Sequence, residues 1–494
     1  MASTASFKQA FGKKQVKNAW MLCLGMLIVL LAVPVSLAIA MPEFTDCKLT
    51  PKGGSASIQA KCTQLTVPEN PDDPNGKQIQ LKIVIVPAKH RNKMPDPLFL
   101  LAGGPGQAIS EAFPAIADSF EKIREDRDLV LVDQRGTGGS NPLDCPSSEK
   151  LLFSPDESAR YIIECADNLD FNPQYYTTLN YIKDLEYVRN ALGYDQINLY
   201  GASYGTLVAQ VYANRYPDRI RAMILDGVAH PGYRVFFDYR QSIPRALEKL
   251  FSRCKEDPDC NKAFPNLKES FLTILERLES EPVPVRIKNP KTGEIVQFDM
   301  TRERFLQAVM PLLYAPETIA LLPLTLHAAA EFNDYEPLAG QSASVDMGIY
   351  PGLMFSVVCA EDVPFFPPET KWPEPGPLEF REHALMVCKI CSQWHTTSQE
   401  RIPDPVISHI PVLLLSGDAD PVTPPESAEK TAAFYPESLH ISLSNMGHGI
   451  INRGCIRDIA ADFIRSGSVT GLDVSCAEDI LPAPFFVNFN GPKP

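Results

Sequence analysis

The sequence predicts an α/β protein, in which a mostly parallel sheet carries helices on both faces and a mainly helical cap is inserted. Short apolar runs typical of buried strands alternate with helical patterns between residues 81 and 226, and strands resume at residue 412. From about residue 233 to residue 402 this alternation stops, and amphipathic helices and proline-rich runs replace it. We therefore expect an N-terminal segment over 1–40, a first core part over 41–232, the cap over 233–402 and a second core part over 403–494.

The composition is that of a globular protein with an acidic body. Of 494 residues, 45% are hydrophobic and 21% are charged, and the formal net charge is −14. The first 40 residues hold four lysines and no acidic residue, so the remainder is more acidic than the total. An acidic body does not attract nucleic acid, and we expect no nucleic-acid partner.

The N-terminal segment predicts export. Its lysines precede an uncharged run over residues 20–40, which contains Pro34 and ends in Ala38-Ile39-Ala40, a small-x-small cleavage pattern. We expect cleavage there. The run is also long enough to span a bilayer, so a retained anchor is the alternative. In both cases the body is expected to be periplasmic or secreted, and residues 20–40 are its one expected contact with a membrane.

The cysteines agree with an oxidising compartment, because eleven of the twelve lie beyond the N-terminal segment. Close neighbours in the sequence suggest the disulfides 47–62, 145–165, 254–260 and 455–476. Cys359 is expected to pair with Cys388 or Cys391, which leaves one thiol over. A zinc site is the competing interpretation of Cys388-Lys-Ile-Cys391, but no second pair with metal-ligand spacing accompanies it.

The individual elements follow from apolar periodicity. Apolar runs predict strands at 81–86, 97–101, 129–132, 197–200, 222–225, 412–415 and 439–443. A helix is expected over 181–192, with Asn180 as its N-cap and Gly193 as its stop, and another over 207–216. In the cap, amphipathic patterns predict helices at 246–251, 271–278 and 305–314. Strands separated by helices predict parallel pairing.

The pentapeptide Gly201-Ala202-Ser203-Tyr204-Gly205 lies between a predicted strand and a predicted helix. It has the form Gly-x-Ser-x-Gly, and the strand, sharp turn and helix around it are the context of a nucleophile elbow. A serine at so tight a turn adopts a strained backbone, which the flanking glycines accommodate. The following helix directs its N-terminal amides towards the serine. We predict that Ser203 is a nucleophile.

A glycine-rich loop, Ala102-Gly103-Gly104-Pro105-Gly106, directly follows the predicted strand 97–101. So many glycines imply that the backbone closely approaches another group. Where a serine is the nucleophile, that group is the oxyanion, which is bound by amides of this loop and of the residue after the nucleophile. Because proline has no amide, Gly104 and its neighbour Gly103 are the loop candidates, and Tyr204 is their partner.

A nucleophilic serine needs a base, and the base needs an acid that fixes its tautomer. His448 fits the base, because it follows the last predicted strand between two glycines that let the loop bend. Asp420 fits the acid, because it follows the strand 412–415, and Asp418 is its nearby rival. The order serine, acid, histidine along the chain is that of the α/β-hydrolases.

Five motifs make this similarity specific. They are Gly-Gly-Pro-Gly from Gly103, Asp-Gln-Arg-Gly-Thr-Gly from Asp133, Gly-x-Ser-Tyr-Gly-Thr from Gly201, Gly-x-x-Asp-x-x-Thr-Pro from Gly417 and Gly-His-Gly from Gly447. Together they resemble the proline iminopeptidase and tripeptidyl aminopeptidase group over most of residues 60–480, and the resemblance favours Asp420 over Asp418. Ala102 departs from the proline iminopeptidases, which usually have a histidine there, and moves the likeness towards the tripeptidyl branch.

The resemblance implies a serine exopeptidase that removes N-terminal residues from peptides through an acyl-enzyme, without a metal or organic cofactor. Its substrates have a free α-ammonium, and a buried carboxylate is the physical means of binding one. Cys359-Ala360-Glu361-Asp362 supplies two candidates: the family-like pattern Cys-x-x-Asp favours Asp362, and Glu361 stays open. A carboxylesterase with the same triad is the first alternative. A non-catalytic peptide-binding protein is the second, and the complete set of catalytic candidates argues against it.

Overall fold

The computed structural model describes the protein over residues 41–51, 57–145, 155–290, 292–372, 376, 378, 380–397, 402 and 405–491. The predicted export segment, residues 1–40, lies outside this described part. Within the described part, no helix is both long enough and apolar enough to cross a membrane.

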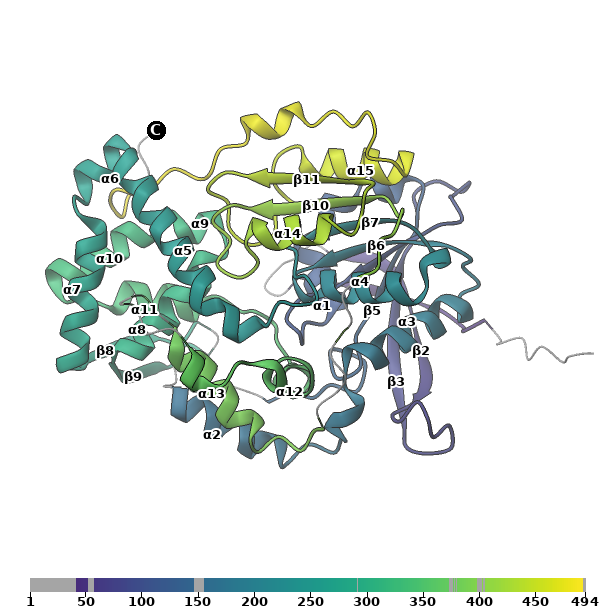
Figure 1. Ribbon diagram of the computed structural model, residues 1–494, viewed down its shortest axis with the longest axis horizontal. Helices are drawn as coiled ribbons and strands as arrows, with labels where there is room; N and C mark the ends of the chain where they lie inside the picture. The colour runs from purple at the N-terminus through teal and green to yellow at the C-terminus, as the bar shows by residue number, and fades with distance from the viewer. Residues whose placement is uncertain are drawn as a thin grey trace, which may run out of the picture. The chain divides into compact units, whose positions relative to one another are not determined.

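A mostly parallel sheet forms the centre of the fold, as the sequence predicts (Figure 1). Its nine described strands pair in the order β1 (Thr45–Leu49), β2 (Ile58–Pro68), β3 (Gln78–Val86), β5 (Leu129–Val132), β4 (Leu98–Leu101), β6 (Ile197–Ala202), β7 (Ile220–Asp226), β10 (Val412–Gly417) and β11 (Ser438–Leu443). The run from β5 to β11 is parallel throughout, whereas β1, β2 and β3 pair in antiparallel fashion at one edge.

Each face of the sheet carries helices, because alternate strand residues are buried on opposite sides. On one face, Phe99 and Leu199 belong to a core shared with α3 (Thr178–Ala191), α4 (Tyr204–Arg215) and α14 (Pro425–Ala432). On the other face, Leu100 and Tyr200 belong to a core shared with α1 (Ile109–Ala112) and α15 (Ile456–Ser466). Burial on both faces explains why these strands are continuous apolar runs in the sequence.

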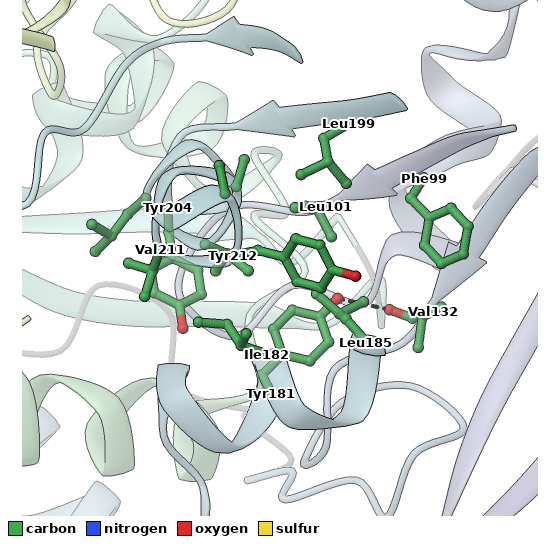
Figure 2. Close-up of a cluster of buried hydrophobic side chains, with 14 of the residues drawn as sticks. Phe99, Leu101, Val132, Tyr181, Ile182, Leu185, Leu199, Tyr204, Val211 and Tyr212 are labelled. Carbon is green, nitrogen blue, oxygen red and sulfur yellow. Dashed lines mark hydrogen bonds between the residues drawn. The ribbon is translucent and has the colours of Figure 1, made fainter. Parts of the chain in front are cut away.

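Figure 2 shows the centre of the first of these cores, between the sheet and helices α3 and α4. Tyr181 of α3 lies in this core, and its hydroxyl donates a hydrogen bond to the carbonyl of Val132 at 2.9 Å. A buried tyrosine hydroxyl needs such a partner. This bond therefore fixes α3 against the carboxyl end of β5.

The N-terminus of α3 differs from the prediction. Thr177, and not Asn180, is the N-cap, and its side chain accepts a hydrogen bond from the amide of Asn180. Both residues are good caps, and the threonine takes the position because the chain already turns into the helix three residues earlier. This correction brings Thr178 to the first turn of α3, where its amide is available to a partner from elsewhere in the chain.

Between β7 and β10 the chain forms the expected insertion, and it is mainly helical (Figure 1). Its α-helices are α5 (Val235–Glu256), α6 (Pro258–Ala263), α7 (Leu267–Ser280), α8 (Arg302–Val309), α9 (Pro316–Ile319), α10 (Leu322–Phe332), α11 (Glu336–Ala343), α12 (Pro351–Glu361) and α13 (Arg381–Cys391). It also contains an antiparallel hairpin, β8 (Val283–Lys288) and β9 (Ile295–Met300), which was not predicted. The hairpin buries Val285 and Ile287 while Arg286 is exposed, and so short an alternation is a weak signal beside long helical patterns.

The segment that links β5 to α3 packs against the insertion. Its helix α2 (Pro155–Ala166) lies beside α13 and shares an apolar cluster with α12 (Figure 1). This packing accompanies a direct contact between the start of α3, at Thr178, and the end of α12, at Glu361. The insertion therefore reaches the helical layer of the core at this point.

Five disulfides join described residues. The four expected between close sequence neighbours are present, and Cys359 pairs with Cys391. Cys388 is the remaining thiol among the described cysteines. Because Cys391 is already bonded, the zinc alternative is wrong. The Cys359–Cys391 bond fastens α13 to the end of α12 that carries Glu361.

Candidate active site

Ser203 lies at the turn between β6 and α4. Its backbone has φ 54° and ψ −122°, a conformation that side-chain-bearing residues rarely adopt. Glycines on both sides permit the turn: a Cβ on Gly201 would lie 2.4 Å from the carbonyl oxygen of Gly205, and a Cβ on Gly205 would lie 2.3 Å from that of Leu101. The turn places the serine at the N-terminus of α4, where the helix dipole favours negative charge.

His448 follows β11 and contacts Asp420, which follows β10. The Nδ1 of His448 lies 2.7 Å from Oδ2 of Asp420. Asp420 is completely buried, and its Oδ1 accepts hydrogen bonds from the amides of Val422 at 2.7 Å and Thr423 at 2.9 Å. The hydroxyl of Thr423 donates to Oδ2 at 2.9 Å. These donors hold the carboxylate in the orientation in which it meets the imidazole.

Asp418, the rival acid, is engaged elsewhere. Its Oδ2 lies 2.8 Å from Nζ of Lys249, and its Oδ1 accepts a hydrogen bond from the amide of Asn445 at 2.6 Å. The structure therefore brings Asp420, and not Asp418, to His448. The sequence resemblance favours the same residue.

The end of β7 lies between Ser203 and His448. The amide of Ser203 donates to the carbonyl of Asp226 at 2.9 Å. A Cβ on Gly227 would lie 2.9 Å from Cε1 of His448. The described side-chain hydrogen bonds of His448 use Nδ1, and none joins it to Ser203. In enzymes without substrate, catalytic hydrogen bonds are often long and tighten only when substrate binds.

Opposing effects act on the pKa of His448. Burial of the ring lowers this pKa, but the carboxylate of Asp420 raises it, and the carboxylate of Asp226 adds to the increase. The net result is a raised pKa. A raised pKa makes the imidazole a stronger base, which suits proton removal from a hydroxyl. The contribution of Asp226 was not predicted from the sequence.

The glycine-rich loop and the start of α4 present two amides next to Ser203. The amide of Gly103 donates to Oε1 of Gln107 at 3.1 Å, so this loop candidate is occupied. The amides of Gly104 and Tyr204 have no partner among the described protein groups. Both residues line the same cavity as Ser203. Two unengaged amides beside the predicted nucleophile are the donors that an oxyanion hole requires.

The cavity at Ser203 has mostly apolar walls. The walls include Leu207, Val235, Val357 and Val422. Two acidic residues, Glu361 and Asp362, also line it. A second space shares Leu207, Tyr233, Glu361 and Asp362 with the first and is also lined by Arg234. The carboxylates thus border both spaces.

The two carboxylates are held differently. Both oxygens of Glu361 accept hydrogen bonds from Thr178, Oε1 from its amide at 2.7 Å and Oε2 from its hydroxyl at 2.6 Å. Asp362 accepts one longer bond, from the amide of Val235 to Oδ2 at 3.3 Å. Glu361 therefore also satisfies the N-terminus of α3, whereas Oδ1 of Asp362 has no described donor.

Burial strongly favours the neutral forms of both acids. It raises the pKa of Glu361 to about 7, against the lowering effect of the Thr178 hydrogen bonds. Burial and then the adjacent charge of Glu361 raise the pKa of Asp362 to about 8. A cation that entered the cavity would reverse this effect, because an opposite charge stabilises the ionised carboxylates.

A chain of hydrogen bonds runs from Gln134 through Tyr204, the residue after Ser203, and Thr178 to Glu361. The side-chain amide of Gln134 donates to the hydroxyl of Tyr204 at 3.3 Å, and that hydroxyl lies 2.7 Å from Oγ1 of Thr178. Since Thr178 donates its single hydroxyl proton to Glu361, the hydroxyl of Tyr204 is the donor to Thr178. Gln134 belongs to the motif Asp-Gln-Arg-Gly-Thr-Gly, which the sequence analysis singled out. No motif in the sequence indicated that Thr178 lies at the site.

Comparisons with known proteins agree with this architecture. Residues 96–299 match the model of the alpha/beta hydrolase fold, and residues 377–476 match the model described as TAP-like protein. The tripeptidyl aminopeptidase of Streptomyces coelicolor is 25% identical over 467 residues, which are 86% of this chain and 84% of that protein. Serine protease Hip1 of Mycobacterium tuberculosis is 32% identical over 208 residues, or 38% of this chain and 40% of that protein.

A third relative belongs to the other branch of the expected group. The proline iminopeptidase of Lactobacillus delbrueckii subsp. bulgaricus is 34% identical over 130 residues, which are 26% of this chain and 35% of that protein. The long match thus runs to a tripeptidyl aminopeptidase, and the shorter matches run to the serine protease and the iminopeptidase. The chain therefore has the α/β-hydrolase fold with a TAP-like C-terminal part, and it resembles the proline iminopeptidase and tripeptidyl aminopeptidase group.

Proposed function

We propose that this protein is an exported serine exopeptidase, which releases residues from the N-terminus of peptides that carry a free α-amino group. The observation that carries the proposal is the acidic pair of buried Glu361 and half-buried Asp362, which lines the same cavity as Ser203. A cavity that holds both a nucleophile and a group that binds the substrate's α-ammonium selects peptides with a free N-terminus.

The chemistry follows from the positions of the side chains. His448 removes the proton of Ser203 as the hydroxyl attacks the scissile carbonyl, and Asp420 stabilises the imidazolium that results. The amides of Gly104 and Tyr204 bind the oxyanion. His448 then gives its proton to the departing amine, and water hydrolyses the acyl-enzyme by the same steps in reverse order.

Glu361 and Asp362 would be stabilised in their ionised forms by a cation, and the described protein groups provide little positive charge beside them. Asp362 is influenced by the charge of Arg234, but that guanidinium lies 3.7 Å from Asp238 in an ion pair of its own. An uncompensated buried carboxylate is costly, and two adjacent ones cost more. A substrate ammonium supplies the missing charge. Because Oδ1 of Asp362 lacks a donor, Asp362 is the direct contact and Glu361 is the second acceptor.

The relatives support the same reaction at a coarser level. Two of them are named tripeptidyl aminopeptidase and proline iminopeptidase, and both names describe release from an N-terminus. The five disulfides support a location outside the cytoplasm, either periplasmic or secreted. We propose that residues 1–40 direct the export and anchor the protein if they are retained.

Paired substrates test the proposal. Chromogenic peptides of one to three residues, each with a free and an acetylated N-terminus, are compared with a short-chain ester. Cleavage confined to free amines supports the exopeptidase, and the best length defines the released product. Ester hydrolysis with equal cleavage of acetylated and free peptides would instead identify a carboxylesterase that uses the same three residues.

A further inference from the structure

Asp226 is a buried acid that the reaction scheme above leaves unused. It ends β7 and is 2% exposed. Its backbone carbonyl accepts the amide of Ser203 at 2.9 Å. Its carboxylate accepts the amides of Ile450 at 2.8 Å and Ile451 at 3.1 Å, and the hydroxyl of Tyr200 at 3.1 Å. Each of these contacts has Asp226 as the acceptor.

These hydrogen bonds connect two loops that are far apart in the sequence. The carbonyl holds the turn that carries Ser203, while the carboxylate holds the amides two and three residues after His448. A serine and a histidine on separate loops need such a link, because an error of about 1 Å in their separation costs about 100-fold in rate.

The carboxylate also acts on His448 through its charge. The groups that face the imidazole are Asp420, Asp226, the hydroxyl of Thr423 at 3.2 Å from Nδ1 and the ring of Tyr314. Of these groups, only the two aspartates carry charge. Burial gives Asp226 a raised pKa, although its hydrogen-bond donors and the charge of His448 act to lower that pKa.

We propose that Asp226 is a positioning residue, which sets the distance between Ser203 and His448 and favours the imidazolium that forms during acyl transfer. This inference rests on the proposed roles of Ser203 and His448. It does not depend on how the substrate amine is recognised. A structural role alone would require the hydrogen bonds and not the charge, and this difference makes the proposal testable.

Asp226→Asn tests it, because asparagine keeps the shape of the side chain but removes the charge and one acceptor. We expect kcat to fall at least about tenfold with KM unchanged, on any substrate that the wild type cleaves. The acidic limb of the pH profile should move to lower pH, because loss of a nearby negative charge lowers the pKa of His448. Tyr200→Phe is the matched control, since it removes one hydrogen bond and keeps the charge, and its limb should stay in place.

The acidic limb of the pH profile can also be measured without a substrate, from the rate at which a small fluorophosphonate labels Ser203 at different pH values. This readout separates the inference from the proposed peptidase activity, which fails on its own if only esters are cleaved. If Asp226→Asn does not fold, Asp226→Ser removes the same charge and should give the same shift. A folded variant with an unshifted limb, or with the kcat of the wild type, overturns the proposal.

Discussion

The Nδ1 of His448 lies 2.7 Å from Oδ2 of Asp420, and the carboxylate in this contact is completely buried. The two residues follow β11 and β10, which are adjacent parallel strands. The carboxyl ends of parallel strands meet at one edge of a sheet, so the fold itself brings the acid and the base together.

This contact predicts different results for two nearby aspartates. Asp420→Asn should lower kcat about 10⁴-fold, because the amide cannot hold the imidazole in the required tautomer or stabilise its cation. Asp418→Asn is the matched control and should have a far smaller effect, since Asp418 bonds to Lys249 and to the amide of Asn445. Steady-state kinetics on one substrate compare the two variants, and equal losses would contradict the assignment of the acid.

Ser203→Ala should abolish turnover, with a loss of about 10⁶-fold, because no other described group replaces the hydroxyl. The positive φ of Ser203 adds a second expectation. Ser203→Gly should be equally inactive but should melt at a higher temperature than Ser203→Ala, because glycine adopts this conformation without strain. Residual turnover in a folded Ser203→Ala protein would remove the serine from its proposed role.

The strands and the loops that follow them could be predicted from the sequence. Strands such as β4 and β10 are buried on both faces and therefore appear as continuous apolar runs. The turn at Ser203 was readable because a close backbone approach requires glycine at Gly201 and Gly205. Ser203, Gly104, Asp420 and His448 each follow a predicted strand, so the strand order predicted their place in the fold, whereas Glu361 and Asp362 lie at the end of α12 in the insertion.

The contacts between segments that are distant in the sequence could not be predicted from it. Thr178 and Glu361 are 183 positions apart, and neither residue type signals that an insertion helix will end on the N-terminus of α3. The same is true of Asp226 and Ile450, because the partner group at Ile450 is a backbone amide, which every residue except proline carries. The periodicity of apolar residues predicts which face of a helix or strand is buried, but it does not predict which residues that face contacts.

The raised pKa values of the two acids predict a pH dependence that only free-amine substrates show. Below about pH 7 for Glu361 and about pH 8 for Asp362, protonation neutralises the carboxylates and weakens their attraction for an ammonium. Up to about pH 7.5, where the α-amine of the peptide still holds its proton, the kcat/KM for a free-amine peptide should therefore rise more steeply with pH than that for an ester. Profiles of equal slope would contradict a role for the pair in binding.

The same acids predict the direction in which stability changes with pH. The folded-state pKa of Asp362, about 8, lies above its ordinary value of 3.8, so the folded state holds a proton that the unfolded state has released. This contribution to stability is lost as pH rises through the folded pKa. The melting temperature of the substrate-free wild type should fall more between pH 6 and about 8.5 than that of Asp362→Asn. Parallel curves for the two proteins would show that Asp362 is not protonated when folded.

The Cys359–Cys391 bond is expected to support substrate recognition as well as stability. Its sequence separation is 32, and removal of a native disulfide costs about 2–5 kcal/mol. Because Cys359 lies one turn from Asp362, Cys359→Ser with Cys391→Ser should also raise KM for free-amine peptides more than for an ester. Cys388→Ser is the control, because this thiol forms no disulfide and its loss should leave both quantities near the wild type.

The most direct test of the central claim is the ratio of kcat/KM for a free peptide to that for its acetylated form, measured in the wild type and in Asp362→Asn. The wild type should prefer the free amine by at least about 100-fold, because a buried ion pair with the substrate is lost on acetylation. In folded Asp362→Asn the ratio should fall towards one, with ester hydrolysis preserved. A wild-type ratio near one, or a ratio that the substitution leaves unchanged, would contradict recognition of the substrate amine by Glu361 and Asp362.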